Sequence, residues 1–392
     1  MVLQRLPETF AGFRHLSVMW VIFVVSLTIM LSSSVSHAKC EFKAIFNFGD
    51  SNSDTGGFSA AFPTLSAPNG MTFFKKPVGR ASDGRLIIDF LAQALGLPFL
   101  SAYLQSIGSN FKHGVNYATL ASTVLLPNTS LFVTGISPFS LAIQLNQMKD
   151  FKAKVLELNP SGYLPPRDIF GKSLNTFYIG QNDFTSNLAA LGIGGVQQYL
   201  PQVVAQIGQT IKELYDLGGR TFLVLNLAPI GCYPAFIVQL PHNNSDLDMF
   251  GCMISYNNAV VHYNNMLKNA LRQTREALGD ASVIYVDTHS VYLELFRHPT
   301  YHGLLHGTKA CCGHGGGVYN FDPQVFCGNR KVVNGSTTLT ATACTDPQNY
   351  VSWDGIHATE AANKLVTWAI LNGSYFDPPF PIYELCDLQP IG

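Results

Sequence analysis

The stretch AIFNFGDSNSDTGG, residues 44–57, organises this chain of 392 residues. Its apolar run, 44–48, stops at Gly49, and small polar residues follow at once. A short apolar run bounded by a glycine is typical of a buried parallel strand. Ligands of open α/β sheets lie just beyond the carboxyl ends of such strands, so Ser51 is well placed to face a substrate. The alternative is a strand that ends in a polar turn, with Ser51 as a helix cap.

A second informative stretch, SWDGIHATEAAN, covers residues 352–363. Asp354 and His357 are three residues apart, and Gly355 between them allows a tight turn. A serine hydroxyl is a weak nucleophile until a base accepts its proton, and the base needs an acid that orients it. One turn before a helix can supply both groups, which favours Ser51 as nucleophile, His357 as general base and then acid, and Asp354 as the orienting carboxylate.

Strands and helices alternate along the chain. The patterns predict strands at 44–48, 115–118, 176–179, 221–227 and 282–286, and helices at 86–95, 141–158, 196–217, 252–278 and 359–371. This alternation predicts a parallel sheet with helices on both faces and right-handed crossovers. No break in composition divides residues 39–392, so we expect one domain. Its main irregular insertion, 299–347, is rich in cysteine and glycine and is expected to form a disulfide-tied cap near the site.

The N-terminal segment 1–38 has the features of a secretory signal peptide. Arg5 and Arg14 precede an uncharged apolar run at 16–31, and Ser-His-Ala at 36–38 fits a cleavage site. The alternative is a signal anchor, but the run is short for a membrane-spanning helix. We therefore expect cleavage after residue 38, no stable membrane span afterwards, and a location in the extracellular or cell-wall space, or in the vacuole.

The cysteines and glycosylation sequons agree with this route. All eight cysteines follow the expected cleavage site, and an even number in a secreted chain predicts disulfides. Cys232–Cys252 is the one pairing that we predict, and the others stay open. The Asn-x-Ser/Thr sequons, which are candidate glycosylation sites, lie at Asn128, Asn243, Asn334 and Asn372.

Three separated motifs follow one another in the chain: FGDSNSD at 48–54, YIGQNDF at 178–184 and WDGIH at 353–357. Three more segments accompany them, GRASDGRLIIDF at 79–90, GVNYA at 114–118 and ACCGHGGGVYNF at 310–321. With these motifs the chain resembles the plant-type GDSL esterases/lipases of the SGNH hydrolase superfamily over nearly its whole length after residue 38. The resemblance implies a three-layer α/β/α, flavodoxin-like domain with a central parallel sheet of about five strands. It also implies the catalytic roles given above for Ser51, Asp354 and His357.

A serine hydrolase also needs donors for the oxyanion. We expect the backbone N–H of Ser51 and the side-chain amide of Asn182 to supply two. The family usually has a glycine five residues after the asparagine of its second motif, but here Asn116 is followed at that spacing by Ala121. The N–H of Ala121 can still serve if its φ is negative. We expect Asp50, Asp54 and Asp183 to support turns of the site.

These features predict a secreted serine carboxylester hydrolase that acts through an acyl-Ser51 intermediate. Acetyl or other short-chain esters of glycosides, polysaccharides or specialised metabolites are the expected substrates. A lipase or an acyltransferase on the same triad and a catalytically silent carbohydrate-binding protein are the alternatives. No cofactor or metal is expected, and the net charge of −1 argues against a nucleic-acid partner.

Overall fold

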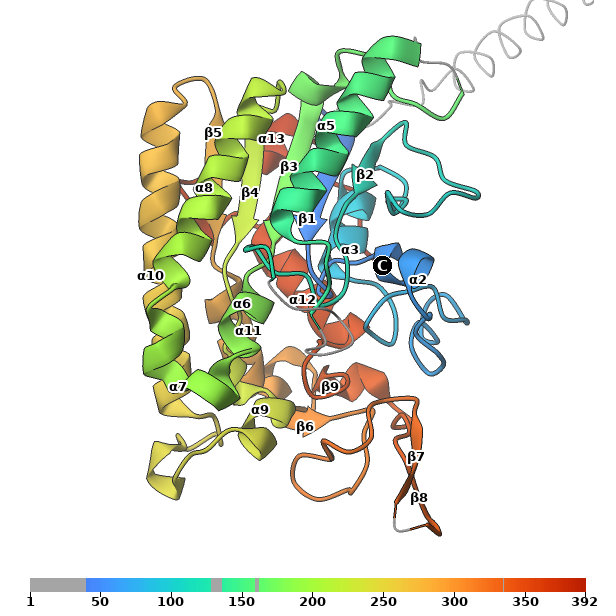
Figure 1. The fold of residues 1–392 in the computed structure, drawn as a ribbon, viewed down its shortest axis with the longest axis vertical. Helices are drawn as coiled ribbons and strands as arrows, with labels where there is room; N and C mark the ends of the chain where they lie inside the picture. The colour runs from blue at the N-terminus through green and yellow to red at the C-terminus, as the bar shows by residue number, and fades with distance from the viewer. Residues whose placement is uncertain (1–39, 128–135, 159–161, 334) are drawn as a thin grey trace, which may run out of the picture. The chain divides into compact units, whose positions relative to one another are not determined.

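A six-stranded sheet forms the centre of the fold, in the order β10-β5-β4-β3-β1-β2 (Figure 1). The computed structural model describes residues 40–127, 136–158, 162–333 and 335–392. The strands are β1 (Ala44–Gly49), β2 (Gly114–Asn116), β3 (Ser173–Tyr178), β4 (Thr221–Leu225), β5 (Ser282–Val286), β6 (His306–Ala310), β7 (Arg330–Val333), β8 (Thr337–Thr340), β9 (Tyr350–Ser352) and β10 (Phe376–Asp377). The helices are α2 (Gly57–Ala61), α3 (Ile87–Ala94), α5 (Leu141–Leu158), α6 (Gln181–Thr185), α7 (Leu188–Gln197), α8 (Leu200–Asp216), α9 (Pro234–Gln239), α10 (Ile254–Ala277), α11 (Thr288–Arg297), α12 (Glu360–Leu371) and α13 (Ile382–Leu385).

Strands β1 to β5 pair in parallel, and the short β10 adds an antiparallel edge to β5. The order β2-β1-β3-β4-β5 is that of the flavodoxin-like fold, as the sequence predicts. All residues of β1 and β3 are buried because helices cover both faces of the sheet. The strand order reverses at β1: β2 lies on one side of it, and β3, β4 and β5 follow on the other side. Ligands of such sheets bind at this switch point, outside the carboxyl ends of the strands.

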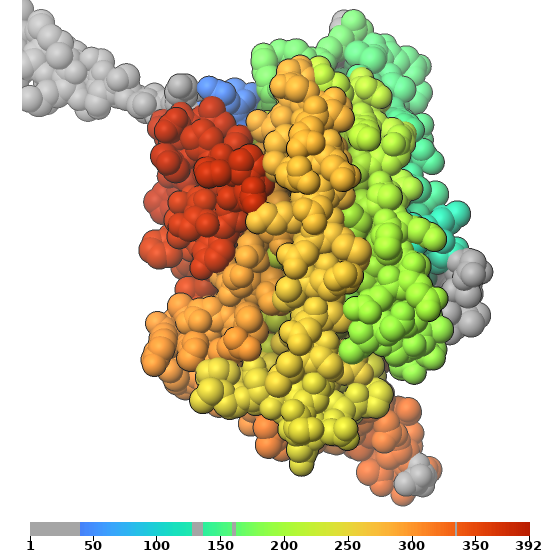
Figure 2. All heavy atoms as spheres, turned by 90° about the vertical axis from the view of Figure 1, so that its left-hand side faces the viewer, coloured from blue at the N-terminus to red at the C-terminus, as the bar shows by residue number. Residues whose placement is uncertain are grey.

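Helices α5, α8 and α10 cover one face of the sheet, and α3, α11 and α12 cover the other (Figure 1). Figure 2 shows α10 as a long column beside α8. The buried residues of α8 recur at helical spacing, with Val203, Ile207, Ile211 and Leu214 on the side that packs inward. These two layers and the sheet between them form the three-layer architecture.

The predicted elements are largely confirmed, although several bounds differ: β3 already begins at Ser173, and β4 ends at Leu225. The helix expected at 196–217 begins only at Leu200, since Pro201 lacks a backbone N–H and so favours the first turn of a helix. The strand β2 is shorter than predicted and ends at Asn116. The insertion 299–347 is not irregular throughout: it contains β6, which pairs with β9, and the hairpin β7–β8.

Four disulfides join all eight cysteines. The predicted pair Cys232–Cys252 is confirmed. The others are Cys40–Cys386, Cys311–Cys344 and Cys312–Cys327. Within the described ranges, no helix has both the length and the apolar character needed to cross a membrane. The expected signal segment 1–38 lies outside these ranges.

Candidate active site

Ser51 lies in the loop that follows β1, and only 4% of its surface is exposed. Gly49 ends the strand, where a Cβ atom would come within 2.1 Å of Ser53 Oγ and 3.0 Å of the Tyr178 carbonyl oxygen. Only glycine fits this close approach. The side chain of Gln144 from α5 then fixes the position, because its amide donates to the Gly49 carbonyl at 2.8 Å and its oxygen accepts from the Gly49 N–H at 2.9 Å.

Asp354 and His357 lie on one tight turn between β9 and α12. One carboxylate oxygen of Asp354 accepts hydrogen bonds from the backbone N–H groups of Ile356 at 2.9 Å and His357 at 2.8 Å. Gly355 has a φ of 97°, a left-handed conformation that favours glycine. The turn closes where the Trp353 N–H donates to the His357 carbonyl at 2.7 Å. Local hydrogen bonding therefore orients the Asp354 carboxylate toward the histidine.

The structure brings Ser51, His357 and Asp354 into one hydrogen-bonded chain. His357 Nε2 lies 2.8 Å from Ser51 Oγ, and His357 Nδ1 lies 2.7 Å from Asp354 Oδ2. Burial alone would lower the pKa of His357, but the Asp354 carboxylate and the charge of Asp50 outweigh it and hold that pKa above its ordinary value of 6.5. Burial opposes ionisation of Asp354, yet its contacts with His357 hold its pKa below 3.8. An ionised Asp354 accepts a hydrogen bond from Nδ1–H, which leaves the unprotonated Nε2 free to accept a proton from Ser51.

The three expected oxyanion donors differ in the hydrogen bonds that they already make. Asn182 lies in α6, just beyond β3, and its side-chain amide donates one hydrogen bond to the Ser122 carbonyl at 2.8 Å, which leaves its second N–H to serve a ligand. The backbone N–H groups of Ser51 and Ala121 donate to no acceptor among the described residues. Ala121 has a φ of 63°. The condition of a negative φ is therefore not met, and this alanine adopts the left-handed conformation that the family's usual glycine accepts without strain.

Two buried carboxylates hold the loop that carries Ala121. Asp54 accepts the Leu120 N–H at 2.8 Å, and its other contacts are with backbone N–H groups at the start of α2. Asp183 accepts the N–H groups of Val124 at 2.7 Å and Leu125 at 3.0 Å. Burial raises the pKa of Asp54 to about 6 and that of Asp183 to about 7, although these N–H groups oppose the rise. Both residues fix turns around the site, as the sequence analysis expects.

Asp50, the neighbour of Ser51, does not hydrogen-bond His357. Its carboxylate accepts the backbone N–H of Asn52 at 2.9 Å and the side-chain amide of Asn52 at 3.0 Å. Burial raises the pKa of Asp50 to about 6. The expected turn-forming role of Asp50 agrees with these contacts.

The sequence analysis did not single out Gln144 or Asn47, although both position the nucleophile loop. Asn47 lies in β1, accepts a hydrogen bond from Thr176 Oγ1 at 2.7 Å and donates to Asn116 Oδ1 at 2.7 Å. Each residue interrupts an apolar pattern, Asn47 within a buried strand and Gln144 on the buried face of α5. A polar residue at such a position must find a buried partner, and this was the available signal.

The glycosylation candidates divide into two pairs. Asn243 and Asn372 lie at exposed positions. Asn128 and Asn334 lie outside the described residues.

Comparisons with known proteins agree with these motifs. The family model described as GDSL-like Lipase/Acylhydrolase matches residues 45–370. A GDSL esterase/lipase of Arabidopsis thaliana is 64% identical over 93% of this chain and 96% of that protein. Another Arabidopsis thaliana protein, named alpha-L-fucosidase 3, is 43% identical over 88% of this chain and 94% of its own length. Among solved structures, a catalytic mutant of an acetylxylan esterase from Geobacillus stearothermophilus aligns with a TM-score of 0.34 and 14% identity, over 84% of this chain and 93% of that one.

Proposed function

Because this chain belongs to the GDSL-like lipase/acylhydrolase family and is a carboxylic ester hydrolase, we propose that it cleaves esters through an acyl-Ser51 intermediate. The observation that carries the proposal is the hydrogen-bonded chain from Ser51 Oγ through His357 to Asp354, with distances of 2.8 and 2.7 Å. In this arrangement a nucleophile, a base and an orienting acid are already in contact.

The reaction has two stages. Ser51 Oγ attacks the ester carbonyl carbon while its proton moves to His357 Nε2. The tetrahedral intermediate then collapses, the bond to the alcohol oxygen breaks, and His357 returns the proton to the departing alcohol. In the second stage His357 accepts a proton from water, the hydroxide attacks the acyl carbon, and the carboxylic acid leaves as Ser51 regains its proton. Asp354 stays ionised and stabilises the imidazolium that forms at each stage.

Negative charge on the carbonyl oxygen needs donors that are not already engaged. Three groups meet this requirement: the N–H groups of Ser51 and Ala121 and the second amide N–H of Asn182. Ala121 does so at a φ of 63°, although the sequence analysis made this donor depend on a negative φ. Loss of one such donor typically costs about 3–4 kcal/mol of transition-state stabilisation. Asn182 is the most informative of the three, because only its donor belongs to a side chain.

We further propose that the enzyme is secreted, that its processed form is a single hydrolase domain over residues 39–392, and that it acts on acetyl or other short-chain esters of glycosides, polysaccharides or specialised metabolites. Four disulfides support the secretory route, because such bonds persist in oxidising compartments. N-glycosylation is proposed at the exposed Asn243 and Asn372. The lipase and acyltransferase alternatives use the same Ser51 chemistry and differ in the acyl chain and in the final acceptor.

The test is hydrolysis of a p-nitrophenyl ester series, from acetate to palmitate, by the secreted protein and its Ser51→Ala variant. Preference for short chains that is lost in the variant supports the proposal, whereas preference for long chains indicates a lipase. Equal background rates for both proteins would reject Ser51 as nucleophile and favour a carbohydrate-binding protein. Because one relative is named a fucosidase, p-nitrophenyl α-L-fucoside belongs in the same assay, and its cleavage by Ser51→Ala would show a separate activity.

A further inference from the structure

Trp353, which directly precedes Asp354, is packed in a small core of its own. Its side chain is only 1% exposed, and the buried residues around it are Cys311 and Cys312. Cys327 and Cys344, the disulfide partners of those two cysteines, pack against the same cluster. The residue before the proposed catalytic acid is therefore held by two disulfides of the 311–344 segment and is not part of the main hydrophobic core.

Backbone hydrogen bonds join the same cysteines to the strand that enters the acid–base turn. The Cys311 N–H donates to the Ser352 carbonyl at 3.0 Å, and the Cys312 N–H donates to the Trp353 carbonyl at 2.6 Å. The Cys344 N–H donates to the Cys311 carbonyl at 2.8 Å, so the far end of the segment is tied to the same point. Displacement of either disulfide would thus move the backbone immediately before Asp354.

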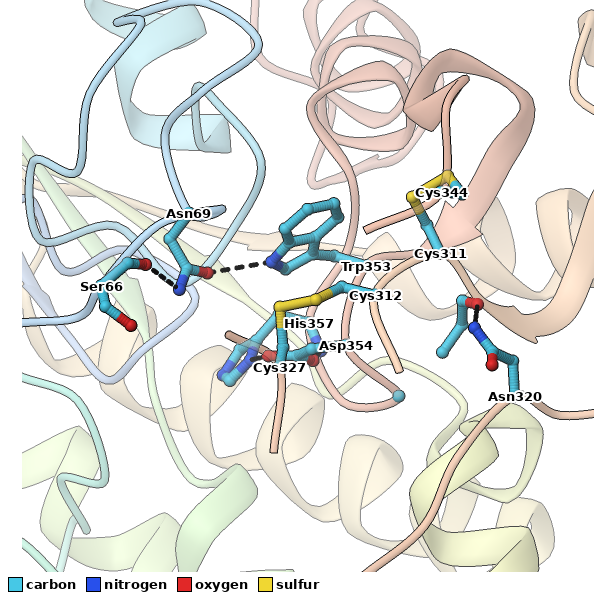
Figure 3. The surroundings of a disulfide bond; sticks show 12 residues. Ser66, Asn69, Cys311, Cys312, Asn320, Cys327, Cys344, Trp353, Asp354 and His357 are labelled. Atoms are coloured by element: carbon cyan, nitrogen blue, oxygen red, sulfur yellow. Dashed lines mark hydrogen bonds and ion pairs between the residues drawn. A yellow bond between two sulfur atoms is a disulfide. The ribbon is translucent and has the colours of Figure 1, made fainter. Parts of the chain in front are cut away.

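The side chain of Asn69, from another loop, and an aromatic ring of the disulfide-tied segment complete this support. Trp353 Nε1 donates to Asn69 Oδ1 at 2.9 Å, and the Asn69 amide donates to the Ser66 carbonyl at 2.9 Å. Figure 3 shows Trp353 lying between Asn69 and the disulfides, beside His357. The ring of Phe321, which also belongs to the disulfide-tied segment, lies 2.7 Å from where a Cβ atom of Gly355 would stand.

We infer that the paired disulfides Cys311–Cys344 and Cys312–Cys327 are positioning elements of the reaction, which hold the Asp354–His357 turn at the distance that proton transfer from Ser51 requires. The inference rests on the proposed function of this triad. A displacement of about 1 Å in a catalytic constellation can lower the rate about 100-fold. Loss of the Cys312–Cys327 bond, whose Cys312 N–H donates to the Trp353 carbonyl at 2.6 Å, is therefore expected to lower kcat by about 10- to 100-fold.

The experiment compares two double variants that each remove one disulfide. Cys312→Ala/Cys327→Ala removes a bond of the small core, and Cys40→Ala/Cys386→Ala removes the bond that joins the two ends of the folded unit. Both are expected to lower the melting temperature. Only the first should lower kcat on p-nitrophenyl acetate, measured well below both melting temperatures, with KM changed by less than about threefold.

The pH profile separates positioning from general loosening. Asp354 holds the pKa of His357 above its ordinary value, so a turn that has lost its support should show a lower apparent pKa in kcat/KM. The Cys40→Ala/Cys386→Ala variant should keep the wild-type profile. An unchanged kcat and profile in Cys312→Ala/Cys327→Ala, or equal losses in both variants, would overturn the inference.

Trp353→Phe keeps the test open if a cysteine variant fails to fold. The phenyl ring retains most of the packing but cannot donate to Asn69, so kcat should fall while the melting temperature changes little. Wild-type kcat and pH profile in a folded Trp353→Phe protein would also count against the inference. Failure of the proposed function is recognised separately, because Ser51→Ala would then retain activity whatever the disulfide variants do.

Discussion

Asp354 and Asp50 offer a test of which carboxylate orients His357, because both lie close to the imidazole and only one is bonded to it. In Asp354→Asn the remaining oxygen can still accept the N–H groups of Ile356 and His357, so the turn should keep its shape. The new NH₂ group would face His357 Nδ1 in place of the oxygen 2.7 Å away. Nδ1 must then act as acceptor, and the proton moves to Nε2, which can no longer accept a proton from Ser51.

The expected loss in kcat for Asp354→Asn is about 10⁴-fold, the size found when a triad aspartate becomes asparagine. At about 1.36 kcal/mol for each factor of ten, this equals about 5.5 kcal/mol of transition-state stabilisation. Asp50→Asn removes only a charge that acts through space. Such a charge contributes about 1–2 kcal/mol at an effective dielectric constant of about 20, so kcat should fall by about 5- to 30-fold.

The assay is steady-state hydrolysis of p-nitrophenyl acetate at pH 7.5, with the circular dichroism spectrum and melting temperature of each variant as controls. Asp346→Asn changes an exposed carboxylate eight residues before Asp354; it is the matched substitution and should keep wild-type kcat. If Asp354→Asn retained activity within about 30-fold of the wild type, or if Asp50→Asn lost as much as Asp354→Asn, the assigned roles would be wrong.

Three further predictions concern the same site. Asn182→Ala should lower kcat about 10²- to 10³-fold through loss of an oxyanion donor, whereas the exposed Asn187→Ala should not; similar kcat values for the two would exclude the amide. Ala121→Gly should change the free energy of unfolding by less than about 1 kcal/mol. Glycine removes about 1 kcal/mol of left-handed strain, but it also gives the unfolded chain more conformational freedom, which destabilises the fold by about 0.4–1 kcal/mol. Denaturant melts should show a larger loss of stability for Ala153→Gly, at an exposed position inside α5. Catalysis needs neutral His357, whose pKa is raised, so kcat/KM should increase with pH through an apparent pKa above 6.5; a midpoint below 6.5 would contradict this.

The types of most elements could be predicted because helices and strands have local periods. The apolar run before Gly49 and the helix at 141–158 follow from residues within a few positions of one another. The pattern after Pro201 also predicted a helix correctly. The predicted start of this helix was too early, because the apolar spacing continues across the turn that precedes the proline. In the cysteine-rich insertion, strands as short as four residues leave too little periodic signal.

Candidate site residues could be selected from short motifs, since each motif combines a reactive side chain with the turn that presents it. The motifs do not show which of them meet in space, because Ser51 and His357 are 306 positions apart in the chain. The conformation of Ala121 was also open, because its positive φ is imposed by a loop held at Leu120 and Val124 by two distant carboxylates. The supporting role of Gln144 depends on the packing of α5 against β1, which no local pattern specifies.

The sequence by itself determined the alternation of strands and helices, the candidate catalytic residues, and the turns that carry them, because all of these depend on neighbours along the chain. Only the tertiary structure decided that β1 and β3 are adjacent, that the turn after β9 reaches Ser51, and that Cys311 and Cys312 bond to Cys344 and Cys327. Eight cysteines allow 105 pairings, and a choice among them requires the sulfur atoms to be brought within bonding distance. That proximity follows from the sheet order and from packing against Trp353, which are properties of the whole fold.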